Sequence, residues 1–181
     1  MSERAFFFAL ILFTVVSCSN EERTQQQAEP NRQQIKEQMV RVNKVQTYNE
    51  ESQIQDFLER YKYPVKTTAT GLRYYIYKRT EGLQPGAHSI VKIDYSVKLL
   101  DGTVCYSSDS TGALEFQIGK TDLPVGLQEG MQLMRVGEQA VFITPSKLGY
   151  GLTGDGAEIP PNAVLYYNVK LLAVVKKNYQ K

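Results

Sequence analysis

The feature that most constrains the fold is a change of hydrophobic period near Gly71. Ahead of this residue apolar side chains recur at helical spacing, whereas beyond it they alternate with polar ones. The longest alternation places apolar residues at Val91, Ile93, Tyr95, Val97 and Leu99. A strand with this pattern has one buried and one solvated face, which is typical of antiparallel sheets. The second part of the chain is therefore predicted to form a sheet whose apolar face must be covered.

The segments around this strand supply further strands and one helix. Leu72, Tyr74 and Ile76 share a face of an earlier strand, and Asp101-Gly102 is a two-residue hairpin signal. We also predict strands at 103–106, 114–118, 139–143 and 165–175, and a short helix at 125–134. This order predicts an α+β fold, in which a curled antiparallel sheet wraps on one short helix. The gap between sheet and helix is the natural place for an apolar pocket.

Residues 1–17 predict a lipoprotein signal peptide. An apolar run, Ala5–Val16, follows Arg4 and stops at Ser17-Cys18. It falls short of the roughly 20 apolar residues that a membrane-spanning helix needs, and its length suits the apolar core of a secretory signal. The last residues, Val15 to Cys18, resemble a bacterial lipobox. We therefore expect palmitate on Cys18 and a lipid anchor in a membrane of the bacterial envelope, facing the periplasm; an ordinary signal peptide cleaved elsewhere is the alternative.

Residues 18–32 and 33–66 are predicted to form a disordered tether and a helical extension. The tether is polar and rich in Gln and Glu. The extension has apolar residues at helical spacing: Ile35, Met39 and Val42, then Ile54, Phe57, Leu58 and Tyr61. Asn49, followed by two glutamates, predicts an N-cap, and Pro64 ends the pattern. The stripe favours packing onto the domain, with a partner-binding or dimerising helix as the alternative.

The composition excludes several classes of function. Cys18 and Cys105 are the two cysteines, so an acylated Cys18 leaves no disulfide framework. His88 is the single histidine, which rules out a histidine-based triad and argues against a metal site. We expect no cofactor and no metal. The net charge of +2, with acids and bases interspersed, indicates no nucleic-acid partner.

The motifs beyond Tyr95 together resemble the signature of FKBP-type peptidyl-prolyl isomerases. These motifs are Asp101-Gly102, Ser107-Ser108, Phe116-Gln117-Ile118-Gly119, Gly126-Leu127-Gln128-Glu129-Gly130, Tyr150-Gly151 and Ile159-Pro160-Pro161. The resemblance implies an isomerase domain at 88–177, with a leading strand and linker at 67–87. The lipobox, the tether and the segment Thr70 to Ile76 look similar to the anchored FKBP lipoproteins of gliding bacteria among the Bacteroidetes.

The resemblance implies a cleft that binds proline-containing protein segments. By similarity the catalytic residues are Tyr95, Phe116, Tyr150, Ile159 and Tyr167, with the phenol of Tyr150 aimed at a substrate carbonyl. The implied substrate-binding residues are Cys105, Tyr106, Leu114, Leu123, Pro124 and Leu127. Such a cleft needs no nucleophile, because an apolar environment favours the twisted, less polar amide over the planar one.

Four departures from the family pattern predict weak or altered activity. Tyr106 replaces a common aspartate, Leu127 a frequent tryptophan and Cys105 a phenylalanine, so the pocket should be wider and less aromatic. Pro124 falls where active members usually donate a backbone N–H to the substrate, and proline has none. Losing that hydrogen bond costs about 1 kcal/mol net.

Three interpretations follow from the sequence. The first is a membrane-tethered prolyl isomerase for exported or envelope proteins. The second is a chaperone or assembly module that binds proline segments in the same cleft without turning them over. The third is a structural role in an envelope assembly through the helical extension. The sequence leaves the oligomeric state open.

Overall fold

The computed structural model describes residues 31–175. The chain divides into two compact units between Gln38 and Met39, and everything below concerns the second unit. In chain order the elements are α1 (Arg32–Tyr61), β1 (Lys66–Thr67), β2 (Arg73–Lys78), β3 (Ile90–Leu99), β4 (Val104–Ser107), α2 (Ser108–Thr111), β5 (Leu114–Gln117), α3 (Val125–Leu133), β6 (Gln139–Thr144), the 3-10 helix η1 (Ser146–Leu148) and β7 (Leu165–Val175).

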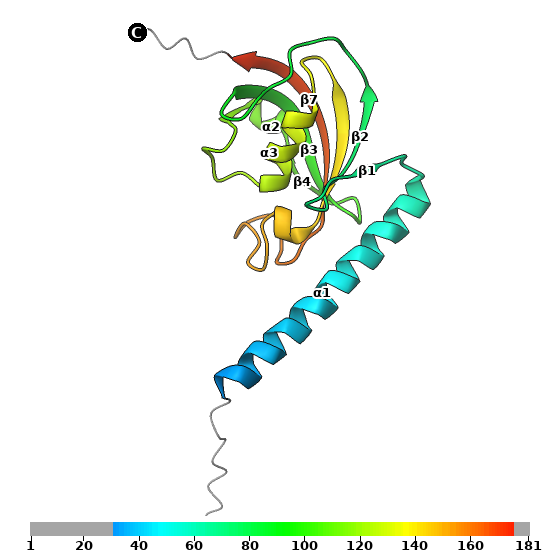
Figure 1. Ribbon diagram of the computed structural model, residues 1–181. Coiled ribbons are helices and arrows are strands. Elements are labelled where there is room, and N and C mark those ends of the chain that lie inside the picture. Colours follow the sequence, from blue (N-terminus) through cyan, green and yellow to red (C-terminus); the bar gives the residue numbers. More distant parts are fainter. Residues whose placement is uncertain (1–30, 176–181) are drawn as a thin grey trace, which may run out of the picture. The chain divides into compact units, whose positions relative to one another are not determined.

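The seven strands form one antiparallel sheet, in which six follow the order β1-β2-β6-β7-β3-β4 and β5 pairs with β3. β3 pairs with β7 along its whole length (Figure 1). On its other side β3 is shared by two short strands, because β5 pairs with Ile90 to Ile93 and β4 with Ser96 to Lys98. The predicted alternation in β3 is confirmed, with Val91, Ile93 and Val97 buried and Lys92 exposed.

α3 covers one face of the sheet. Leu127 and Met131 of this helix are almost fully buried in a cluster that includes Phe142 and Tyr167 from the sheet. The approach is close, because a Cβ atom on Gly130 would lie 2.5 Å from the Phe142 ring. Each buried side chain of this size contributes about 1.5–3 kcal/mol. The expected α+β fold, a curled antiparallel sheet on a short helix, is confirmed.

The second half of α1 covers the opposite face of the sheet. Ile54 and Phe57 pack in a separate cluster with Val141, Ile143 and Val164. β6 is consequently buried on both faces, which explains why it reads as a continuous apolar run. The predicted packing of Ile54 and Phe57 onto the domain is confirmed.

Two local predictions are wrong. Asn49 is not an N-cap, because α1 continues through it without a break. The two glutamates after it serve tertiary contacts instead: Glu50 accepts hydrogen bonds from Ser146, and Glu51 forms an ion pair with Arg73. The Asp101-Gly102 turn is a three-residue loop closed by a hydrogen bond from Leu99 to Thr103, with Gly102 at φ +98°.

The predicted signal peptide and Cys18 lie outside the described residues, as does all but the last part of the tether. Among residues 31–175 the structure has no helix that is both long and apolar enough to cross a membrane.

Candidate functional site

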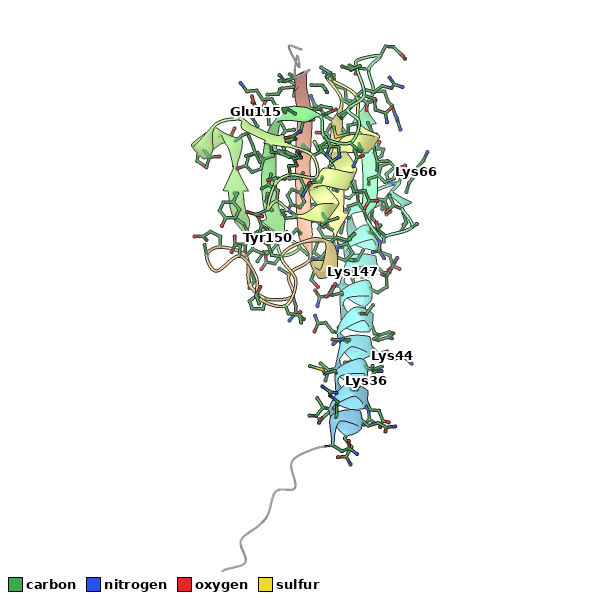
Figure 2. The ribbon with its side chains drawn as sticks, turned by 60° about the vertical axis from the view of Figure 1, so that its left-hand side comes forward. Lys36, Lys44, Lys66, Glu115, Lys147 and Tyr150 are labelled. Atoms are coloured by element: carbon green, nitrogen blue, oxygen red, sulfur yellow. The ribbon has the colours of Figure 1, made fainter. Side chains whose placement is uncertain are left out.

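A mostly apolar cleft of about 180 Å³ opens between the sheet and α3. Its lining comes from all parts of the domain: Tyr95 and Val97 (β3), Tyr106 (β4), Leu114 (β5), Leu123, Pro124 and Leu127 (start of α3), Tyr150 and Ile159 (the β6–β7 connection) and Tyr167 (β7). Figure 2 shows Tyr150 at the end of the sheet away from Glu115. A short helix crossing a curled sheet leaves this gap because Pro124 and Leu127 reach only part of the facing strands.

Most of the predicted site residues meet in this cleft. Four of the five predicted catalytic residues line it, and so do five of the six predicted substrate-binding residues. Phe116 does not line the cleft and packs in the core cluster. Cys105 is also absent from the lining; its half-buried thiol lies 4.0 Å from the carbonyl of Thr103, and burial raises its pKa. Val97 is a lining residue that the sequence reasoning missed.

The cleft contains four tyrosines with different hydroxyl environments. The hydroxyl of Tyr95 lies 3.2 Å from that of Thr111, and the hydroxyl of Tyr106 donates to Asp155. The described residues provide no hydrogen-bond partner for the hydroxyls of Tyr150 and Tyr167, although both side chains line the cavity. The phenols of Tyr95 and Tyr106 are therefore held in place by hydrogen bonds and shape the cleft. The phenols of Tyr150 and Tyr167 can donate to a ligand.

Burial keeps both of these phenols protonated. It raises the pKa of Tyr150, with a further contribution from the negative charge of Asp155. It also raises the pKa of Tyr167, which is 2% exposed. Both groups are thus neutral hydrogen-bond donors across the physiological pH range.

Asp155 links the β6–β7 connection to β4 by hydrogen bonds, and both line the cleft. One of its carboxylate oxygens accepts from the backbone N–H groups of Ala157 (2.9 Å) and Ile159 (2.8 Å), and the other accepts from Tyr106. Burial alone would raise the pKa of Asp155, but these hydrogen bonds lower it below its ordinary value. The same interaction raises the pKa of Tyr106 to about 12. We call this Tyr106–Asp155 pair the clasp; its aspartate has no signal in the sequence.

A buried serine supports the segment that carries Tyr150. The carbonyl of Ser146 accepts from the N–H groups of Gly149 and Gly151, both at 2.9 Å. The N–H of Ser146 donates to Glu50 at 3.1 Å, and its hydroxyl donates to the other oxygen of the same carboxylate. The Glu50 carboxylate of α1 thus binds Ser146, whose carbonyl in turn binds the residues on both sides of Tyr150.

Behind this turn lies a second and larger cavity, of about 240 Å³. Most of its lining residues are polar or charged, although most of its lining surface is apolar. They come from α1, from Arg73 and from the β6–β7 connection: Asn43, Gln46, Thr47, Glu50, Glu51, Ile54, Arg73, Pro145, Ser146, Lys147, Gly151, Leu152 and Asn162. In Figure 2, Lys147 lies next to α1. Size alone would favour this cavity as the site. We assign the site to the smaller cleft, because that is where the predicted residues converge.

Comparison with known proteins decides the family. The family described as FKBP-type peptidyl-prolyl cis-trans isomerase matches residues 82–172, which is half of the chain. The chain belongs to this family. The cleft between α3 and the sheet, with Tyr95, Leu127 and Tyr150 on its walls, is therefore the cleft of an FKBP domain.

Several bacterial FKBP proteins are similar to this chain. A probable FKBP-type isomerase, FkpA, from Neisseria meningitidis serogroup B is 44% identical over 111 residues, 61% of this chain and 40% of that protein. A 22 kDa FKBP-type isomerase from Escherichia coli is 37% identical over 112 residues, 61% of this chain and 53% of that protein. The chain thus spans about two fifths to one half of these FKBP relatives.

Solved structures agree with the fold. The crystal structure of FkpA from Escherichia coli superposes with a TM-score of 0.63 at 26% identity, over 80% of this chain and 73% of that one. An isomerase from Pseudomonas syringae superposes with the same TM-score at 25% identity, over 74% of this chain and 96% of that one.

Proposed function

We propose that this chain is a membrane-anchored peptidyl-prolyl cis-trans isomerase that accelerates X-Pro isomerisation in exported or envelope proteins. The observation that carries the proposal is the apolar cleft in an FKBP domain, lined by four tyrosines, three leucines and Ile159. The barrier to isomerisation is about 18–20 kcal/mol and comes from amide conjugation. Twisting the bond removes that conjugation and lowers the polarity of the amide.

The walls of the cleft act through differential solvation. Water stabilises the planar, polar amide, so transfer into a water-poor cleft raises its free energy more than that of the twisted amide. Each 1.36 kcal/mol of such preference corresponds to a tenfold increase in rate. Leu127 and Ile159, each 2% exposed, provide such an environment together with the tyrosine rings.

Tyr150 supplies a hydrogen bond from the rim of the cleft. Its phenol is neutral and unpaired within the described residues, so it can donate to a substrate carbonyl. Pro124 lines the same cleft and begins α3 as its N-cap residue, but it has no N–H to donate. Substrate anchoring therefore relies on side-chain donors.

The decisive experiment is the cis-to-trans exchange rate of a Leu-Pro tetrapeptide with the full chain and with Tyr150→Phe. Wild-type acceleration that falls about fivefold in the variant, in line with a lost hydrogen bond of about 1 kcal/mol, supports the proposal. A Tyr48→Phe variant is the matched control, because that tyrosine is 75% exposed on α1. A folded wild-type chain without any acceleration would contradict it.

A binding module is the second candidate function, and two observations favour it. Pro124 removes a donor from the cleft, and the clasp between Tyr106 and Asp155 ties the two walls together. A module of this kind would bind proline peptides without accelerating their exchange. Peptide titration beside the rate measurement separates the two functions.

The anchor belongs to the proposal as well. The support is the apolar run ending at Ser17-Cys18, and the Cys18→Ala variant is expected to lose incorporation of labelled palmitate. Labelled palmitate on this variant would contradict a lipid anchor at Cys18. The segment Thr70 to Ile76 resembles FKBP lipoproteins of gliding bacteria, which supports substrates among the proteins of the gliding machinery. Loss of surface spreading in a deletion strain tests this role.

A further inference from the structure

Tyr167 carries a hydroxyl group that the fold buries without a partner. The side chain is 2% exposed and lines the buried end of the cleft. Hydroxyl groups of five other tyrosines have partners within the described residues: Tyr63, Tyr77, Tyr95, Tyr106 and Tyr166. The other described tyrosines without a hydroxyl partner are exposed or half-buried, whereas Tyr167 is buried, so its hydroxyl calls for an explanation of its own.

This hydroxyl faces the open space of the cleft. In the described part of the chain the fully buried polar side-chain atoms without a partner are Thr144 Oγ1 and Asn162 Oδ1. The Tyr167 oxygen is not among them although its residue is almost completely buried, so its remaining accessible surface lies toward the cavity that it lines. Burial raises the pKa of Tyr167, and the negative charges of Tyr150, Cys105 and Asp155 raise it further.

The same cleft lacks a donor at another position. Pro124 lines the cavity beside Leu127 and has no N–H group. A polypeptide bound there brings several main-chain carbonyl groups into an apolar space, where a carbonyl without a hydrogen-bond donor is destabilised. The Tyr167 hydroxyl can donate a hydrogen bond to one of these carbonyl groups, so the cleft and the polypeptide are complementary.

We propose that the Tyr167 hydroxyl donates a hydrogen bond to a main-chain carbonyl of the bound proline segment and supplies the anchor that Pro124 lacks. The inference rests on the proposed function of the cleft. The carbonyl concerned is one that does not twist, because a donor to the isomerising amide would favour its planar form and slow the reaction. The hydrogen bond then stabilises ground state and transition state equally, which affects KM and leaves kcat unchanged.

The test is the Tyr167→Phe variant of the full chain, which removes the hydroxyl and keeps the ring. With a Leu-Pro tetrapeptide we expect KM to rise about 3- to 10-fold at constant kcat, as for the loss of one hydrogen bond. The Tm should stay the same or rise, because the lost hydroxyl had no protein partner. NMR titration of the tyrosine rings with the same peptide should show an equal loss of affinity.

Tyr166→Phe is the matched control. Tyr166 neighbours Tyr167 on β7 but packs on the other face of the sheet, where its hydroxyl lies 3.3 Å from that of Tyr63. This variant should lower the Tm by a few degrees and leave KM unchanged.

Two results would overturn the inference: an unchanged KM and peptide affinity in Tyr167→Phe, or a lower Tm with unchanged KM, which would assign the hydroxyl a structural role. Titration separates this inference from the proposed function, since a wild-type chain that binds the peptide without turning it over contradicts only the latter. A wild-type chain that does neither overturns both.

Discussion

The two cavities on either side of the Tyr150 turn differ in their lining and in the work they can do. The smaller one is walled mainly by tyrosine and leucine side chains, and the tyrosine hydroxyls are its polar groups. The larger one is lined by amides and by the charged groups of Glu50, Glu51 and Arg73. An apolar cavity can change the relative stability of two amide geometries. Around the larger one, the hydrogen bonds between Glu50 and Ser146 fix the backbone of the turn.

The comparison teaches that aromatic and aliphatic side chains form the wall of the cleft, whereas charged side chains and hydrogen bonds support the turn behind it. Tyr150 stands between the two cavities, with Gly149 and Gly151 both hydrogen-bonded to Ser146. Ser146 in turn is held by Glu50 from α1. The extension is therefore more than a spacer, since it contributes a buried carboxylate to the turn that carries the rim phenol.

The largest expected effect comes from breaking the apolar side with Leu127→Ala. Leu127 is 2% exposed, and truncating such a residue costs about 2–5 kcal/mol because a cavity remains. Urea denaturation measures the loss, and the wider cleft should also lower peptide affinity. Val125→Ala on the same helix is the control, since Val125 is 60% exposed and should change stability by less than about 0.5 kcal/mol.

Breaking the polar side with Glu50→Ala should have the next largest effect. The substitution leaves the N–H and hydroxyl of Ser146 without their acceptor, at a cost of about 1–3 kcal/mol. It should also lower isomerase activity by releasing the Tyr150 turn. Glu59→Ala, an exposed carboxylate on the same helix, should leave both quantities unchanged. Equal activity in Glu50→Ala and wild type would show that the turn stands without α1.

The smallest effect is expected at the clasp. Tyr106→Phe removes one hydrogen bond to a partly exposed carboxylate, which is worth about 1 kcal/mol after allowing for solvent screening. Because the folded pKa of Asp155 is lowered, this contribution is complete above the unfolded value near 3.8 and disappears as pH falls through the folded pKa. Because the pKa of Tyr106 is raised to about 12, it is also lost at the alkaline end as pH rises through that value.

The stability difference between wild type and Tyr106→Phe should therefore be flat from about pH 5 to 9 and shrink in acid. Denaturation curves at a series of pH values check this. A difference that grows as the pH falls below 4 would contradict the clasp.

Pattern in the sequence predicted most of the elements and a large part of the cleft. β7 was predicted at its observed bounds, and α3 and β6 to within one residue, because hydrophobic period and turn residues are local signals. Phe116 was placed in the cleft, although alternation along a strand reports only that a side chain faces the apolar side. Whether it meets the core or the cavity depends on how far α3 reaches across the sheet.

The two glutamates after Asn49 also show that a local pattern can fit more than one tertiary placement. Glu50 and Glu51 match the first turn of a helix in sequence, yet they sit inside α1 and bind Ser146 and Arg73. The local sequence is compatible with glutamates in the first turn of a helix and with glutamates in its middle. The packing of α1 on the sheet decides between these two placements. The tie between Tyr106 and Asp155 is equally invisible, since 49 residues separate its partners.

By itself the sequence determined the fold class and the strongly patterned strands and helix, because burial on a regular strand or helix depends on residue spacing. The family and the cleft residues came from the resemblance of its motifs to FKBP-type isomerases. Tertiary structure alone decided which hydroxyls are free, which carboxylate supports the Tyr150 turn, and that the sheet is covered on both faces. Those features depend on distances between segments far apart in the chain, and no local pattern encodes such distances.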